Sequence, residues 1–207
     1  MNILLDKLPT AVKVGGKMYD INADFRTGIR LEMTAVSELD DTEKLMRRLL
    51  LYYGDIACVP ADVGAAFTAV MNFYHCDKDN ASQGGTATNR RTQIYSFEHD
   101  APYIYAAFLQ QYGIDLNKIE SEDLHWWKFS ALFQSLGEDM KISKIMYYRD
   151  VDLRGKSKGE RAFLSDMKKR YALKCSRNIH TQFSSLAQRD AKMKAYVERR
   201  FAAIETR

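Results

Sequence analysis

The sequence predicts a mostly α-helical protein, an α-rich α+β fold in which a helical domain carries a small N-terminal β-hairpin and a C-terminal helical arm. Apolar residues recur at steps of three and four along most of the chain, as on one face of an α-helix, and alternate at steps of two near its start. Apolar side chains make up 46% of the 207 residues, which is enough for a sizeable core. We therefore expect a folded, helix-rich body.

The β-hairpin is expected over residues 11–21. Val12 and Val14 alternate with polar residues, and the Gly-Gly pair at 15–16 has the backbone freedom that a tight hairpin turn requires. The Tyr-Ser-Phe segment at 95–97 is a candidate third strand of the same sheet.

Three amphipathic helices are expected in the N-terminal half, over residues 24–36, 42–53 and from 60 to about 71. Asp24 is a candidate N-cap of the first helix. The apolar residues Ile29, Met33 and Val36 lie in this helix. Pro60 is expected to open the third helix.

Residues 77–93 differ from both halves of the chain. They are rich in Gly, Asn, Ser and Thr and show no apolar period, which predicts a flexible loop. We expect this loop to divide the N-terminal half from an aromatic half.

The aromatic half, residues 95–149, holds both tryptophans and half of the tyrosines. Asp100 and Gly113 are the expected N-cap and C-terminal stop of its first helix, a second helix is expected after Ser121, and a third from residue 142. The second helix is apolar over a wide arc, so it is either buried in the core or buries itself against a partner. Its candidate partner-contact residues, which are core residues in the other alternative, are Trp126, Trp127, Phe129 and Phe133.

Several strings in this half match a known pattern, namely Tyr-Gly-Ile-Asp-Leu at 112–116, Leu-His-Trp-Trp-Lys-Phe at 124–129 and Tyr-Arg at 148–149. With the strand, Gly-Gly and strand of the N-terminus, they resemble the phage gene-product-fifteen family over roughly residues 1–175. That family is encoded among the tail genes of long-tailed phages and prophages of Gram-positive bacteria. The resemblance implies a role in tail morphogenesis, as an assembly chaperone for the tape-measure protein or the major tail protein that forms the tube. It brings no catalytic motif.

The charge of the chain is unevenly distributed. Residues 1–153 hold 16 Lys and Arg against 22 Asp and Glu, whereas residues 154–207 hold 15 against 5. We interpret 1–153 as the body and 154–207 as a basic helical arm joined by the Gly-rich segment 154–159. The arm carries an apolar stripe that we expect to contact a partner or another copy of the chain, and its candidate contact residues are Phe183, Leu186, Val197 and Phe201.

The arm leaves other interpretations open. It could dock on the acidic body, or its Lys-Lys-Arg run at 168–170 could bind nucleic acid, an alternative that we rank below a protein partner. Self-association into a homo-oligomer is a further possibility.

Enzyme, metal and cofactor chemistry find no support in the sequence. The four histidines, at positions 75, 99, 125 and 180, do not stand at the spacings of zinc ligands, and no nucleophile, base and orienting group form a known motif. We expect no catalytic residues, no metal and no cofactor. The three widely spaced cysteines favour reduced thiols in a cytosolic setting, and no apolar run reaches the roughly 20 residues of a membrane span.

The expected function is therefore that of a non-enzymatic phage tail-assembly protein in the cytoplasm of the host bacterium, a chaperone for the tape-measure protein or the tube protein. The alternatives are a structural tail component that stays in the virion and a nucleic-acid-binding protein that uses the basic arm.

Overall fold

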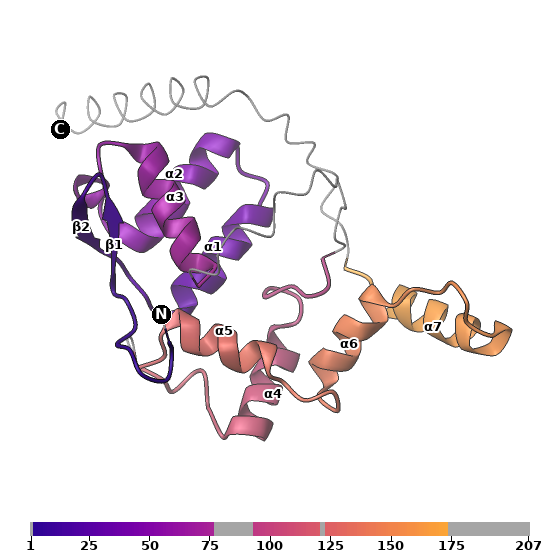
Figure 1. Cartoon of the computed structure of the whole chain (residues 1–207). Coiled ribbons are helices and arrows are strands. Elements are labelled where there is room, and N and C mark those ends of the chain that lie inside the picture. The colour runs from indigo at the N-terminus through magenta and orange to yellow at the C-terminus, as the bar shows by residue number, and fades with distance from the viewer. Residues whose placement is uncertain (1, 77–92, 121–122, 174–207) are drawn as a thin grey trace. The chain divides into compact units, whose positions relative to one another are not determined.

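The computed structural model describes residues 2–76, 93–120 and 123–173. These residues form a two-stranded antiparallel sheet, one short 3-10 helix and seven α-helices, so the predicted α-rich α+β class is confirmed (Figure 1). They divide into two compact units. The described part of unit 1 comprises residues 2–76 and 125–127, and that of unit 2 comprises 93–120, 123–124 and 128–173.

The hairpin of unit 1 has the predicted form. Strand β1 (Ala11–Val14) pairs with β2 (Lys17–Asp20). Gly15 and Gly16 turn between them with φ of 54° and 85°. A two-residue turn with positive φ at both positions matches the twist of the strands, and glycine adopts it at little steric cost.

Three α-helices complete unit 1 together with the 3-10 helix η1 (Ile56–Cys58). They are α1 (Phe25–Val36), α2 (Asp41–Tyr53) and α3 (Val63–Tyr74). Each begins after an aspartate whose carboxylate accepts backbone N–H groups of the first turn, as an N-cap does: Asp24, Asp40 and Asp62. The third helix therefore begins after Asp62 and not at Pro60.

Helix α1 buries a face in which a glycine lies among larger side chains. Met33 and Val36, two of its apolar residues, are exposed. The buried residues are Phe25, Thr27, Gly28, Leu31 and Thr34. This face turns inward because Gly28, which has no side chain, leaves room for a large ring that comes from a distant part of the sequence.

Unit 2 is helical. Its helices are α4 (Ala101–Tyr112), α5 (Trp126–Gln134, from residue 128 onward), α6 (Lys141–Asp150) and α7 (Lys158–Arg170). Gly113 ends α4 in the left-handed conformation, as predicted. Within the unit, α6 contacts both α4 and α7.

Two local predictions in this unit were wrong. Residues 95–97 are not a strand: they lead into a turn in which the Asp100 N–H donates to the Ser96 carbonyl at 2.8 Å, and the segment runs on into α4. The helix expected after Ser121 begins only at Trp126, and residues 121–122 lie outside the described part.

The first part of the predicted arm belongs to unit 2. Helix α7 begins with a capping box, in which Ser157 and Glu160 satisfy each other's backbone N–H groups, and it packs on α6. The predicted boundary after residue 153 therefore does not coincide with a boundary between the compact units. Residues 174–207, the rest of the arm, and 77–92 of the predicted loop lie outside the described residues.

Candidate functional site

Four of the eight predicted contact residues lie in the described part, and all four are buried. Their exposed fractions are 5% for Trp126, 5% for Trp127, 0% for Phe129 and 9% for Phe133. Of the two alternatives left open by the sequence, this burial favours the core over an interface. The other four, Phe183, Leu186, Val197 and Phe201, lie outside the described residues.

The two tryptophans close the C-terminal end of α3 in unit 1. The Trp127 Nε1–H donates to the Phe73 carbonyl and the Trp126 Nε1–H to the Tyr74 carbonyl, each at 2.8 Å. The last four carbonyls of an α-helix receive no hydrogen bond from an N–H of the same helix, and a buried indole N–H needs an acceptor. The pair of rings satisfies both needs at once.

A gap in α1 receives one of these rings. A Cβ atom at Gly28 would lie 2.2 Å from Trp126 Cε3, closer than side-chain carbons approach one another. On its other side the Trp126 ring stacks on Tyr74, with centroids 5.0 Å apart and planes 15° apart. The ring of Trp126 is thus enclosed between α1 and α3.

His125 is held as a neutral ring in the same cluster. Its Nδ1 accepts the backbone N–H of Trp127 at 3.0 Å, so this nitrogen carries no proton. Its Nε2 lies 2.9 Å from the Pro9 carbonyl, to which an Nε2–H donates. Both ring nitrogens have structural partners, which agrees with a core histidine more than with a general base.

Phe129 is the centre of a separate aromatic cluster in unit 2. It stacks on Phe108 at 5.0 Å with planes 12° apart and runs parallel to Phe133 at 6.1 Å. Phe97 packs at 6.1 Å from Phe129, and Tyr95 lies edge-on to Phe133 at 5.1 Å. Rings in such stacked and edge-on arrangements stabilise a core beyond their buried area alone.

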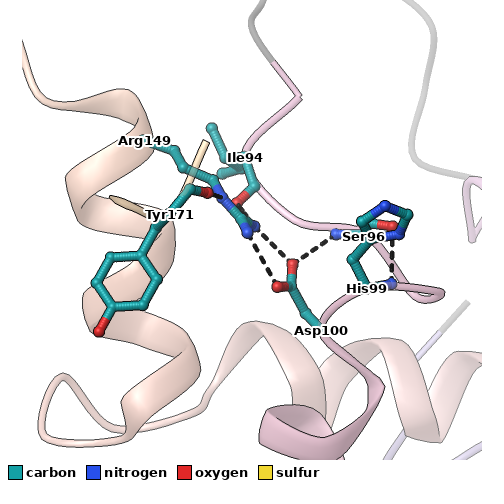
Figure 2. Close-up of polar contacts among 6 residues, drawn as sticks. All are labelled: Ile94, Ser96, His99, Asp100, Arg149 and Tyr171. Carbon is teal, nitrogen blue, oxygen red and sulfur yellow. Dashed lines mark hydrogen bonds and ion pairs between the residues drawn. The ribbon is translucent and has the colours of Figure 1, made fainter. Parts of the chain in front are cut away.

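A buried ion pair joins three segments of unit 2 (Figure 2). The Arg149 guanidinium binds the Asp100 carboxylate through two hydrogen bonds, of 2.5 Å and 2.9 Å. It also donates to the Ile94 carbonyl at 3.0 Å and to the Tyr171 carbonyl at 2.6 Å. The Asp100 carboxylate in turn accepts the Ser96 N–H at 2.8 Å, so both charges are paired and hydrogen-bonded.

The sequence pattern predicts Asp100 as the N-cap of α4 and does not reveal this pair. Asp100 occupies the cap position but its side chain makes no cap hydrogen bond, because the carboxylate faces Arg149. The arrangement holds the segment before α4, helix α6 and the end of α7 together. Its chemical role is structural.

Neither cluster has the pattern of a catalytic or metal site. Within residues 2–76, 93–120 and 123–173, no three His, Cys, Asp or Glu side chains form a group that could hold a metal ion. His75 and His99 are exposed, and His180 lies outside the described residues. No helix among the described residues is long and apolar enough to cross a membrane.

Among the described residues, the most exposed large apolar side chains lie in a turn at the N-terminus, which the sequence pattern did not indicate. Leu4 and Leu5 are 87% and 81% exposed. The turn is closed on itself: the backbone N–H of Leu5 donates to the Asn2 carbonyl at 3.1 Å, and that of Asn2 donates to the Asp6 carboxylate at 2.7 Å. An ordered turn that presents two leucines to solvent is a candidate contact surface.

Comparison with known proteins assigns the chain to a family. No curated protein and no solved structure matches it. The family model described as "Bacteriophage Gp15 protein" matches residues 4–173, which include the hairpin, the tryptophan pair and both members of the buried ion pair. The chain therefore belongs to the bacteriophage Gp15 protein family.

Proposed function

We propose that this phage protein is a non-enzymatic tail-assembly chaperone that binds the tape-measure protein during tail morphogenesis. The observation that carries the proposal is the family match over residues 4–173, together with the tail-gene role that the resemblance implies. The clusters that contain the family's aromatic strings are structural, so the proposal needs no reaction centre.

The N-terminal turn supports this role. A tape-measure protein is a long chain of helices whose apolar seams tend to aggregate until they are covered. Leu4 and Leu5 are apolar, solvent-exposed and held in place by hydrogen bonds of the turn, so little order has to be gained when they meet a helix. The predicted arm stripe around Phe183 and Phe201 remains a second candidate surface.

The test is co-expression with the tape-measure protein of the same phage. The wild-type protein should keep the tape-measure protein in the soluble fraction and co-purify with it, and Leu4→Ser with Leu5→Ser should abolish both effects. Met18→Ser is the matched control, because Met18 is 64% exposed and lies in the same unit on β2. Equal solubility of the tape-measure protein with and without this protein would refute the chaperone role.

One alternative remains within the same family, a structural tail component that stays in the virion. Mass spectrometry of purified virions separates the two roles, since a chaperone leaves the particle and a component is found in it at a fixed copy number.

A further inference from the structure

A row of aromatic rings, two of them exposed and two half-buried, runs over α6 and α7 in unit 2. Tyr147 and Phe163 are 53% and 55% exposed, although rings of this size are usually buried. Tyr148 lies between them, with its centroid 5.8 Å from Tyr147 and 6.3 Å from Phe163, and it stacks on Tyr171 at 6.0 Å. Leu164, the neighbour of Phe163, is the buried residue of α7.

The segment that carries these rings has a net positive charge, and one of its cations contacts a ring. Residues 141–170 contain ten Lys and Arg and four Asp and Glu, and two of the ten cations are ion-paired, Arg149 with Asp100 and Arg154 with Asp152. The Lys141 ammonium lies 5.0 Å from the centre of the Tyr171 ring and donates to its hydroxyl at 2.7 Å. We name the rings and cations of residues 141–171 the aromatic–basic surface.

Unit 1 carries a surface of the opposite character at the end of α1 and the start of α2. Met33 and Val36 are 37% and 42% exposed and stand three residues apart, on one face of the helix. Residues 37–43 contain no Lys or Arg and four exposed acids, Glu38, Asp40, Asp41 and Glu43. We name residues 33–43 the acidic–aliphatic surface.

We propose that the aromatic–basic surface of one copy binds the acidic–aliphatic surface of a second copy. Each surface joins exposed apolar side chains to a net charge, and the two charges are opposite, which is the complementarity that steers and orients association. Because the surfaces differ, the contact is head-to-tail, and every added copy leaves one surface of each kind available. Such an interface builds rings or open filaments and does not stop at a dimer unless the rotation closes.

A second copy accounts for more of these features than a nucleic acid does. Single-stranded nucleic acid would use exposed rings and cations, but it would give no partner to the exposed Met33 and Val36 or to the acidic run beside them. The proposal is independent of the chaperone role, since it concerns how copies of this chain bind one another.

The test uses two full-length variants, each with one altered surface. Phe163→Glu with Lys144→Glu changes the aromatic–basic surface, and Val36→Lys with Glu38→Lys changes the other; all four side chains are exposed, so folding should persist. In sedimentation velocity, the mass of the wild type should rise with concentration beyond that of a dimer. Each variant alone should associate at least about tenfold more weakly, as expected when one buried ring or branched side chain is replaced by a charge.

An equimolar mixture of the two variants gives the decisive result. Each variant keeps one native surface, so the mixture should form a 1:1 complex that grows no further, which also shows that both variants are folded. Leu109→Glu and Met18→Lys are the matched controls, since both residues are exposed and lie outside the two surfaces, and these variants should associate as the wild type does.

Three outcomes would overturn the proposal. The first is a wild-type protein that stays monomeric at all concentrations, as it would if each chain docked on itself. The second is self-association that neither variant weakens, or a mixture that forms no complex. The third is tight binding of a labelled single-stranded oligonucleotide that Phe163→Glu abolishes and Val36→Lys leaves intact, which would assign the rings to nucleic acid.

Discussion

Replacing Gly28 with Ala should destabilise unit 1, although alanine is the better helix former. At a solvent-facing position inside a helix, Gly→Ala raises the free energy of unfolding by about 0.8–1 kcal/mol. Here the added Cβ would lie 2.2 Å from Trp126 Cε3 and 2.4 Å from Cδ2, atoms of a rigid ring that cannot bend away. Overpacking of this kind costs about 1–3 kcal/mol, and a displaced indole also loses its hydrogen bond to Tyr74, worth about 0.5–1.5 kcal/mol.

The expected net loss is about 1–3 kcal/mol in the free energy of unfolding. Urea denaturation followed by tryptophan fluorescence measures it for unit 1, because both tryptophans of the chain lie in that unit. Gly64→Ala in α3 is the matched control: the nearest atom to its new Cβ is 3.5 Å away, so the change should be neutral or stabilising.

The close approach of Gly28 and Trp126 also predicts that substitutions at the two positions are coupled. In a Trp126→Ala background the ring is gone, so the Gly28→Ala penalty should disappear. If Gly28→Ala alone were as stable as Gly64→Ala, the close fit of the ring against α1 would be refuted.

Three further predictions concern buried polar groups. Asp100→Asn leaves the buried Arg149 without its countercharge, and the thermal unfolding of unit 2, followed by circular dichroism, should show a loss of about 3–5 kcal/mol. Tyr52→Phe removes a buried hydroxyl that has no hydrogen-bond partner among the described residues and should be neutral or stabilising. Tyr53→Phe removes a donor to the Ala66 carbonyl and should cost about 0.5–1.5 kcal/mol; the reverse order in urea denaturation would contradict this. Burial, helped by the neighbouring Tyr19, raises the pKa of Tyr53 to about 12, whereas a tyrosine in the unfolded chain has a pKa of about 10, so the unfolded chain loses this proton first as the pH rises. The free energy of unfolding should therefore be intact below about pH 10 and fall between pH 10 and 12, and it should fall less steeply in Tyr53→Phe.

Features set by neighbouring residues could be predicted from the sequence. The hairpin turn depends on two glycines in a row, and the first helix begins after Asp24 because its carboxylate reaches the backbone N–H two residues on. The stop of α4 at Gly113 depends on one backbone conformation. The apolar character of the segment with Trp126, Trp127 and Phe129 indicated that these rings are buried. It did not distinguish burial in the core from burial in an interface.

Features set by distant residues could not be predicted in this way. Which face of α1 is buried depends on a ring about a hundred positions further on, and a glycine inside a helical pattern was the one local sign of a close approach. The position of Asp100 before α4 is that of a helix cap, and its ion pair could not be foreseen because Arg149 is 49 residues away in the sequence. The exposure of Phe163 likewise depends on how α7 lies on α6, and helical spacing alone does not distinguish Phe163 from Leu164.

Unit 1 is built from separate segments of the sequence, and a further prediction follows for fragments of the chain. Residues 125–127 supply the rings that cap α3, so a chain that ends at residue 92 lacks them. Burial of two tryptophan side chains contributes about 1.5–3 kcal/mol each, and their hydrogen bonds about 0.5–1.5 kcal/mol each, which exceeds much of the stability of a small domain. We therefore expect fragment 1–92 to be unfolded alone and to co-purify, folded, with a co-expressed fragment 93–207. Trp126→Ala with Trp127→Ala in the second fragment should abolish co-purification, whereas Phe163→Ala, an exposed ring of the same fragment, should not. If fragment 1–92 gave a cooperative unfolding transition by itself, the tryptophan pair would be an accessory to unit 1 and not a part of its core.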